Sequence, residues 1–123
     1  MIKKDYPLGI DIGSTTVKIA VLNPYYELTF ADYRRHHADI RGTLADLVRE
    51  AKDQIGDVMV HPVITGSGGL TLANYLEIPF VQEVIAVSSA LERFAPQTDV
   101  AIELGGEDAK IIYFEGGNIE QRM

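Results

Sequence analysis

The 123-residue chain contains no cysteine, so it can hold no disulfide, thiolate metal site or iron–sulfur cluster of its own. It has no apolar run close to the roughly 18 residues that a membrane helix needs. The first residues, MIKKDYPLG, lack the apolar region of a signal peptide. From these absences we expect a cytoplasmic protein with no membrane partner.

Clustered positive charge is also missing. The chain has 11 Lys and Arg against 18 Asp and Glu, a formal net charge of −7, and the basic residues form no stripe. A nucleic-acid surface neutralises phosphates with clustered cations, so we expect no nucleic-acid partner. The charge is compatible with a single nucleotide, because a few backbone N–H groups and one metal ion can hold a triphosphate.

A buried apolar strand in PLGIDIG and two alternating segments, VKIAVLN and ELTFADYRRH, predict a meander of three antiparallel strands over residues 7–35, joined by short links. The period then becomes helical in RGTLADLVREAKDQIG, where we expect Thr43 as the N-cap and Gly56 as the stop. The expected core residues of this helix are Leu44, Leu47, Val48, Ala51 and Ile55. The next segment, MVHPVITG, predicts a strand in which Pro62 indicates an irregular start or a sheet edge.

Two helices and three more strands complete the predicted order. The helices are expected in SGGLTLANYLEI and VQEVIAVSSALERFAP, and the strands in DVAIELGGEDAKIIYFEGGNIEQRM. Three antiparallel strands followed by alternating helices and strands are the plan of a ribonuclease H-like α/β fold. We assign residues 1–97 to a first such subdomain and residues 98–123 to the first β-hairpin of a second one.

Two glycine turns bracketed by acidic residues are the most informative feature of the chain. The first lies in GIDIGSTTVKIAVL, residues 9–22, where Asp11 ends a strand. Glycine lets a backbone approach a ligand closely, and successive N–H groups in a tight turn suit phosphate oxygens. A carboxylate at the strand end can hold Mg²⁺ through its waters. The hydroxyls that follow the glycine belong to Ser14, Thr15 and Thr16.

The second turn contains Gly105 and Gly106, with Glu103 before them and Glu107 after them. If the two turns face each other, they clamp the terminal phosphates of a nucleotide from both sides, and the side chain after the second pair of glycines orients an attacking water. Glycine, serine, threonine and aspartate are also ordinary turn residues, and either turn alone is structural more often than phosphate-binding; the phosphate interpretation depends on the two turns together.

Beyond these general features, GIDIGSTTVKIAVL resembles the first phosphate loop of the actin-like ATPase and sugar-kinase superfamily. Together with VITGSGG, VQEVIAVSSAL and AIELGGEDAKIIYFEGGNIEQRM, it makes the chain similar to the activators of 2-hydroxyacyl-CoA dehydratases and to the related benzoyl-CoA reductase ATPase subunits, the BadF/BadG family. The similarity is greatest to the long CoA-substrate-specific enzyme activases and covers residues 7–123.

This resemblance implies a homodimeric ATPase that uses ATP, ADP and Mg²⁺. A 4Fe–4S cluster shared across the dimer would pass one electron to a 2-hydroxyacyl-CoA dehydratase component. The resemblance makes Asp11 the Mg²⁺-linked acid. The nucleotide-binding residues that it implies are Gly13, Ser14, Thr15, Thr16, Lys18, Gly105, Gly106, Asp108 and Lys110. From its place in a strand alone, Lys18 could equally be a solvated residue.

Glu107 departs from the family pattern, which usually has glutamine there. An ionised Glu107 near a γ-phosphate would repel it unless Mg²⁺ or a proton compensates, or it could act as the base for water. Asp11 and Glu107 are therefore the candidate catalytic residues.

The cluster-binding cysteines of the family are absent from this chain. We therefore interpret it as the truncated N-terminal part of a longer ATPase, and expect this part alone to bind ATP poorly and to turn over no ATP. The alternative is a sugar- or acyl-kinase-type phosphotransferase domain of the same superfamily. A third interpretation is a non-catalytic interaction domain that keeps the fold.

Three further features have simpler interpretations. His36 and His37 are expected in a solvated turn without a metal role, because no third ligand is evident. Ser67 is interpreted as the N-cap of the following helix, with a phosphate contact as the alternative. Ser88 lies on a helix with no base nearby, so it is not expected to be a nucleophile.

Overall fold

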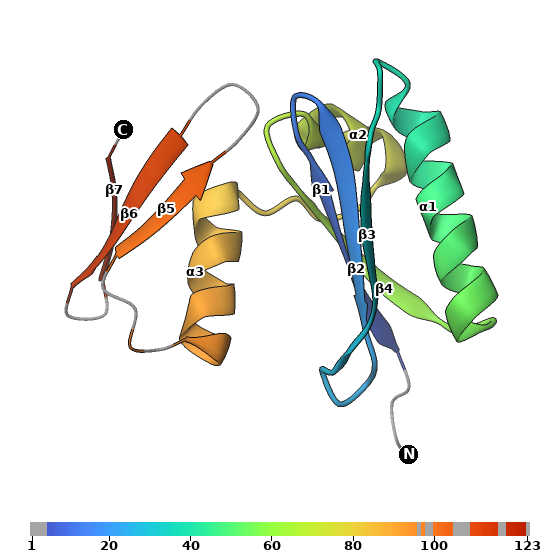
Figure 1. Ribbon diagram of the computed structural model, residues 1–123, viewed down its shortest axis with the longest axis horizontal. Coiled ribbons are helices and arrows are strands. Elements are labelled where there is room, and N and C mark those ends of the chain that lie inside the picture. Colours follow the sequence, from blue (N-terminus) through green and yellow to red (C-terminus); the bar gives the residue numbers. More distant parts are fainter. Residues whose placement is uncertain (1–4, 96, 98–99, 105–108, 116–117, 123) are drawn as a thin grey trace. The chain divides into compact units, whose positions relative to one another are not determined.

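The structure, a computed structural model, describes residues 5–95, 97, 100–104, 109–115 and 118–122. The chain divides into two units, Met1–Phe80 and Val81–Met123 (Figure 1). The third helix, α3 (Glu83–Phe94), therefore belongs to the second unit. The subdomain boundary predicted from the sequence lies later, after residue 97. The element order is three strands, a helix, a strand, two helices and three strands, which confirms the predicted order.

The first unit is built on a four-stranded sheet with the order β3-β2-β1-β4. Its strands are β1 (Tyr6–Ile12), β2 (Thr16–Leu22), β3 (Leu28–Arg35) and β4 (Val60–Thr65). Strand β2 pairs antiparallel with both β1 and β3, and β4 runs parallel to β1. Pro62 lies in the edge strand β4, as predicted, where a missing N–H is tolerated.

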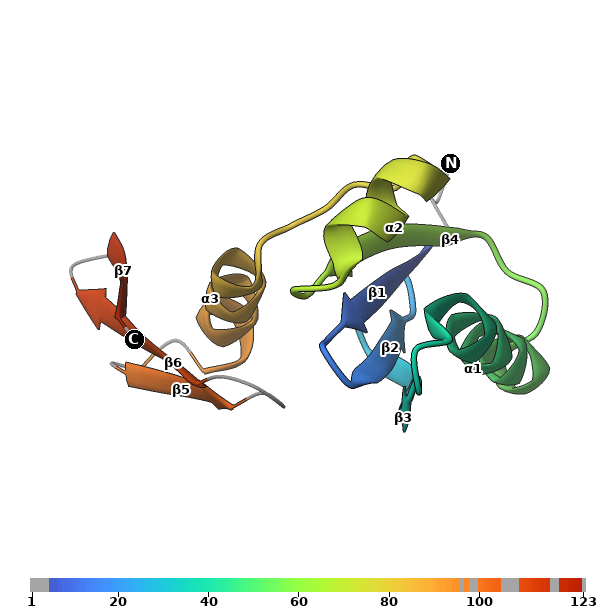
Figure 2. The same ribbon diagram turned by 90° about the horizontal axis from the view of Figure 1, so that it is seen from above.

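One face of this sheet forms the core. Since side chains alternate along a strand, Ile10 and Ile12 of β1 share a face with Val17 and Ile19 of β2, and all four are buried. Helix α1 (Ile40–Ile55) packs against β2 and β3, whereas α2 (Gly69–Leu76) lies beside β4 (Figure 2). Both helices contribute side chains to the same cluster, so the first unit has its own hydrophobic core.

The start of α1 differs from the prediction. Asp39, not Thr43, is the N-cap, and its carboxylate accepts a hydrogen bond of 3.1 Å from the Gly42 N–H. The helix begins one turn earlier because Asp39 offers this acceptor and Ile40 packs against the core. The predicted end is confirmed, since Gly56 has a φ of 98° and its N–H donates to the Lys52 carbonyl.

The predicted inner face of α1 is correct except at Val48. Leu44, Leu47 and Ala51 are buried and Ile55 is partly buried against the core. Val48 is 38% exposed, so its assignment to the core was wrong. Val48 directly follows Leu47, and successive side chains of a helix point in different directions. The Val48 side chain therefore lies at the border of the buried face.

The second unit contains α3 (Glu83–Phe94) and a three-stranded antiparallel sheet in the order β5-β6-β7. The strands are β5 (Val100–Leu104), β6 (Ala109–Glu115) and β7 (Asn118–Arg122). Within α3, the buried Ser88 hydroxyl donates to the Val84 carbonyl at 2.6 Å. In the part of the chain that the structure describes, no helix is long and apolar enough to cross a bilayer.

Candidate functional site

The predicted phosphate turn lies where β1 ends and β2 begins. The Gly13 N–H donates to the Thr16 carbonyl at 2.9 Å and closes a tight connection, which we call the 13–16 turn. Ser14 and Thr15 at its tip are exposed, and Gly13 and Thr16 are partly buried. The turn therefore places two hydroxyl-bearing residues on the surface of the first unit.

Glycine at position 13 is not required by the fold. A Cβ built there would lie 3.5 Å from the Thr16 Oγ1 and 3.6 Å from the Thr16 carbonyl oxygen, which are ordinary contacts. The φ of Gly13 also lies outside the left-handed region that favours glycine. Close approach of a ligand to the main chain would explain a glycine here.

Below the turn, a row of polar residues crosses the sheet on the face opposite the core. Asp11 of β1 pairs with Lys18 of β2 and with Thr65 of β4, and Lys18 pairs with Tyr33 of β3. Directly paired residues point to the same face, with Cβ atoms about 4.5–5.5 Å apart in antiparallel strands. The structure thus brings the predicted residues Asp11 and Lys18 together, and the Lys18 side chain is exposed.

Arg35 joins this group at the end of β3, although the sequence analysis did not select it. It pairs with Thr16 in register, so both residues lie on the polar face, one row closer to the 13–16 turn. Arg35 is exposed. Two cationic side chains, Lys18 and Arg35, therefore flank the turn on a protein whose net charge is −7.

A second glycine segment, residues 65–69, packs against the end of β1. The Gly68 N–H donates to the Ile12 carbonyl at 2.9 Å. Gly66 has a φ of 101°, and a Cβ there would lie 2.3 Å from the Ile12 carbonyl oxygen and 2.5 Å from Asp11 Oδ1. Unlike Gly13, Gly66 is required for this close approach of two backbones.

Ser67 is not the N-cap of α2. Gly68 occupies that position and makes no side-chain hydrogen bond, while Ser67 is exposed. The prediction failed because the start of α2 is fixed by the main-chain bond from Gly68 to the end of β1. The alternative role of Ser67, a phosphate contact, stays a prediction.

His36 was also placed wrongly by the sequence analysis. Its side chain is buried rather than solvated, with 9% exposure, and its Nε2 lies 3.2 Å from the Gly13 carbonyl oxygen. Its main-chain N–H donates to the Thr15 carbonyl at 3.0 Å. Because Arg35 pairs with Thr16, the chain just beyond β3 continues alongside the 13–16 turn. His37 is exposed, as expected.

The second predicted turn cannot be compared with the first one. Gly105, Gly106, Glu107 and Asp108 lie outside the described residues, and the structure describes Lys110 only as a backbone position in β6, opposite Glu103 in register. The facing of the two turns stays a prediction.

The residues around Asp11 are compatible with a single magnesium ion. Among the described residues no group of three or more His, Cys, Asp and Glu could form a metal cage. Mg²⁺ instead prefers one or two carboxylates, phosphate oxygens and retained waters. Asp11 supplies one carboxylate, and in the register position beside it the Thr65 Oγ1 is buried without a hydrogen-bond partner in the described part of the chain.

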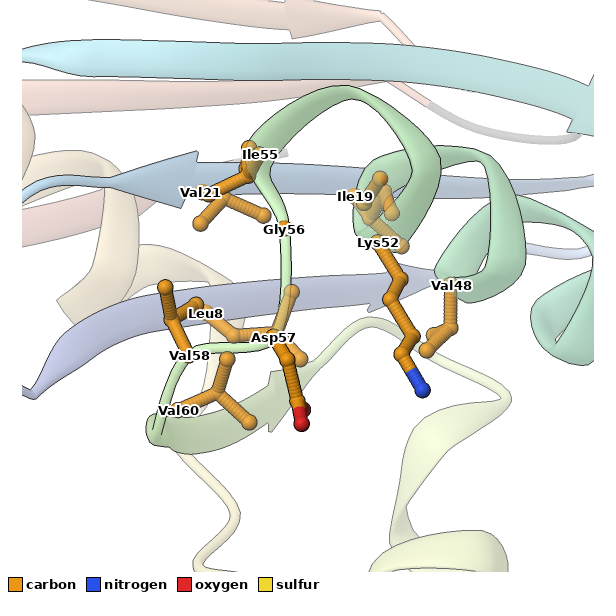
Figure 3. Close-up of a pocket in the computed structure, with 11 residues that line it drawn as sticks. Leu8, Ile19, Val21, Val48, Lys52, Ile55, Gly56, Asp57, Val58 and Val60 are labelled. Carbon is orange, nitrogen blue, oxygen red and sulfur yellow. The ribbon is translucent and has the colours of Figure 1, made fainter.

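A separate groove in the first unit, with a volume of about 140 Å³, has a different character (Figure 3). It lies between the end of α1 and the core face of the sheet, and Lys52 and Asp57 are its charged residues. The others are Leu8, Ile19, Val21, Val48, Ala51, Ile55, Gly56, Val58 and Val60. This lining is too apolar for phosphates, so the polar face remains the candidate nucleotide site.

Sequence comparison identifies no relative. No protein-family model matches the chain, and no curated protein matches it. Comparison with solved structures does find similar folds. One is component A of the (R)-2-hydroxyglutaryl-CoA dehydratase of Acidaminococcus fermentans, at 23% identity and a TM-score of 0.75, covering 96% of this chain and 47% of that protein.

Two more structures have the same fold. The activator of the 2-hydroxyisocaproyl-CoA dehydratase of Clostridium difficile, with bound ADPNP, is 22% identical with a TM-score of 0.72, covering 95% of this chain and 45% of that protein. The ethanolamine utilization protein EutJ of Carboxydothermus hydrogenoformans is 14% identical with a TM-score of 0.69, covering 94% of this chain and 49% of that protein. The chain thus spans about half the length of these proteins, and the similarity confirms the predicted ribonuclease H-like α/β fold.

Proposed function

We propose that this chain is the N-terminal nucleotide-binding part of an ATP-dependent activator of a 2-hydroxyacyl-CoA dehydratase. The observation that carries the proposal is the 13–16 turn beside Asp11 and Lys18 on one face of the sheet. Two structures with similar folds are a component and an activator of such dehydratases, and the activator holds ADPNP.

In this proposal the 13–16 turn contacts the phosphates. Ser14 and Thr15 are exposed, and their N–H and hydroxyl groups are donors that suit phosphate oxygens, while the small Gly13 allows the oxygens to approach the main chain. Lys18 and Arg35 add positive charge on the same face. These features together compensate part of the charge of a triphosphate in an otherwise acidic protein.

Magnesium would bind next to Asp11, through water, and would also contact the phosphates. Its chemical contribution there is to neutralise the charge of the terminal phosphates. Gly66 keeps the space beside Asp11 Oδ1 free of a side chain, since a Cβ would lie only 2.5 Å from that oxygen. The chain's own task is to hold the carboxylate of Asp11 near the end of β1, beside Gly66.

The rest of the site would come from the second unit. We propose that Gly105, Gly106 and Asp108 form the opposing phosphate turn, and that Lys110 follows it on β6. Glu107 would act as the base for the attacking water when Mg²⁺ balances its charge.

The same proposal extends to the complete protein. The longer polypeptide would be a cytoplasmic homodimer that carries a 4Fe–4S cluster on residues outside this chain. Hydrolysis of ATP would then drive electron transfer to the dehydratase component. The predicted boundary after residue 97 belongs to this proposal, because it marks where the second ribonuclease H-like subdomain would begin.

A titration followed by nuclear magnetic resonance tests the nucleotide site directly in the 123-residue chain. A dissociation constant of about 1 mM corresponds to only about −4 kcal/mol and is still measurable in this way. With Mg·ADPNP, we expect saturable shifts of the amides of Asp11, Ser14, Thr15 and Gly66. The absence of shifts, or shifts confined to the apolar groove beside α1, would contradict the proposal.

The Asp11→Asn variant tests the magnesium site in the same titration. It keeps the size of the side chain and removes the charge, so nucleotide binding should lose most of its dependence on Mg²⁺ while binding without the metal changes little. An Asp11→Asn chain that keeps the full magnesium effect would place the metal elsewhere. Asp53→Asn, an exposed position on α1, is the control.

A further inference from the structure

His36 makes contacts to the 13–16 turn through both its side chain and its main chain. The ring Nε2 lies 3.2 Å from the Gly13 carbonyl oxygen, and the main-chain N–H donates to the Thr15 carbonyl at 3.0 Å. The two carbonyls belong to residues on either side of Ser14. One buried residue directly after β3 therefore holds both halves of the turn.

The contacts of the ring determine its tautomer. Nδ1 accepts a hydrogen bond of 3.1 Å from the Ala38 N–H, so Nδ1 carries no proton. In a neutral imidazole the proton then lies on the other nitrogen. Nε2–H is therefore the donor, and the Gly13 carbonyl oxygen is its acceptor.

This hydrogen bond also sets the direction of the next N–H group. The carbonyl of Gly13 and the N–H of Ser14 belong to the same planar trans peptide, in which they point in opposite directions. Holding the Gly13 oxygen toward His36 thus turns the Ser14 N–H away from His36. It also keeps the negative end of the carbonyl dipole away from a bound anion.

We propose that His36 is a positioning residue of the phosphate site, which holds the Gly13 and Thr15 carbonyls back so that the Ser14 N–H is presented to a phosphate oxygen. The role rests on the proposed nucleotide-binding function and adds to it a residue that would not touch the nucleotide. His36 also supports the start of α1, because its carbonyl accepts from the Asp39 N–H at 2.7 Å. The test must therefore separate the turn from the helix.

The first measurement needs no ligand and no variant. Long-range ¹⁵N–¹H spectra of the histidine rings at about pH 8, where an imidazole is ordinarily neutral, report which nitrogen carries the proton. We expect the Nε2–H tautomer for His36. The Nδ1–H tautomer, or a mixture typical of a solvated ring, would overturn the proposal whatever the nucleotide does.

The second measurement compares two substitutions at the same site. The amide nitrogen of His36→Gln can reach the position of Nε2 and donate to Gly13, whereas His36→Asn reaches only the position of Nδ1 and can accept from Ala38. The net loss of one hydrogen bond typically weakens an interaction by a factor of up to about ten. We expect His36→Asn to weaken Mg·ADPNP binding by about that factor. The affinity of His36→Gln for Mg·ADPNP should stay within about threefold of that of the original chain.

Urea denaturation of both variants supplies the control for folding. A purely structural role predicts that the affinity for Mg·ADPNP follows the stability, with no advantage for glutamine. Equal affinities of the two variants, or a His36→Asn chain that binds like the original, would overturn the proposal. If the original chain binds no nucleotide although the tautomer is as expected, the proposed function fails and the role in phosphate binding fails with it.

Discussion

Replacing Gly66 by alanine should destabilise the first unit more than the same replacement at Gly56, the other glycine of positive φ among the described residues. The φ of Gly66 is 101°, and a new Cβ would lie 2.3 Å from the Ile12 carbonyl oxygen and 2.5 Å from Asp11 Oδ1. The Ile12 carbonyl cannot move cheaply, because it is part of the backbone of β1, and its carbon would also lie only 2.7 Å from the new Cβ.

Two costs add up in this variant. Holding alanine in a sparsely populated backbone conformation costs about 1–3 kcal/mol. Relieving the contact with β1 requires a backbone shift of the kind that overpacking produces, at about 1–3 kcal/mol more, and weakens the 2.9 Å bond from the Gly68 N–H to Ile12. We expect Gly66→Ala to lower the free energy of unfolding by about 2–6 kcal/mol.

Gly56→Ala is the matched control, because the chain has a second glycine of nearly equal φ. Gly56 has a φ of 98°, but nothing lies within 4 Å of the position of a Cβ. The Gly56→Ala variant should therefore lose only the free energy that is needed to hold alanine in this backbone conformation. Urea denaturation followed by far-ultraviolet circular dichroism measures both variants. A Gly66→Ala chain that loses no more stability than the Gly56→Ala chain would refute the close packing of residues 65–69 against β1.

Three other predictions concern single residues. Gly13→Ala should keep stability within about 0.5 kcal/mol, because its Cβ makes only ordinary contacts, but should weaken Mg·ADPNP binding in the titration described above. Leu47→Ala should cost about 2–5 kcal/mol in urea denaturation, since Leu47 is fully buried, whereas Val48→Ala should cost less than about 1 kcal/mol; equal losses would contradict the orientation of α1. Asp39→Ala should cost about 1 kcal/mol through loss of the N-cap and Thr43→Ala less, and the reverse order would support the N-cap predicted from the sequence.

The fold was largely predictable because it depends on local periodicity. The apolar run in β1, the alternation in β2 and β3 and the helical spacing of Leu44, Leu47 and Ala51 predicted the correct elements and most of the core. The errors occurred at positions where neighbouring residues were equally suitable. Thr43 and Asp39 are both good N-cap residues, and the choice depended on whether Ile40 could pack against the sheet.

The candidate site was predictable only where one segment contained it. Asp11 and the 13–16 turn are contiguous, so the sequence pattern alone selected them. Arg35 and His36 were missed because their relation to the turn depends on the pairing of β3 with β2. A shift of that pairing by one residue would move His36 away from Gly13, and nothing in RRHH itself sets the register.

The sequence by itself determined which segments become strands and helices, and where the chain carries a glycine turn with an acidic residue before it. These properties depend on residues within a few positions of one another. The tertiary structure alone decided that Gly66 must be glycine and that His36 is buried against the turn. Those outcomes depend on contacts between strands distant in sequence, which exist only after the sheet has formed in one register.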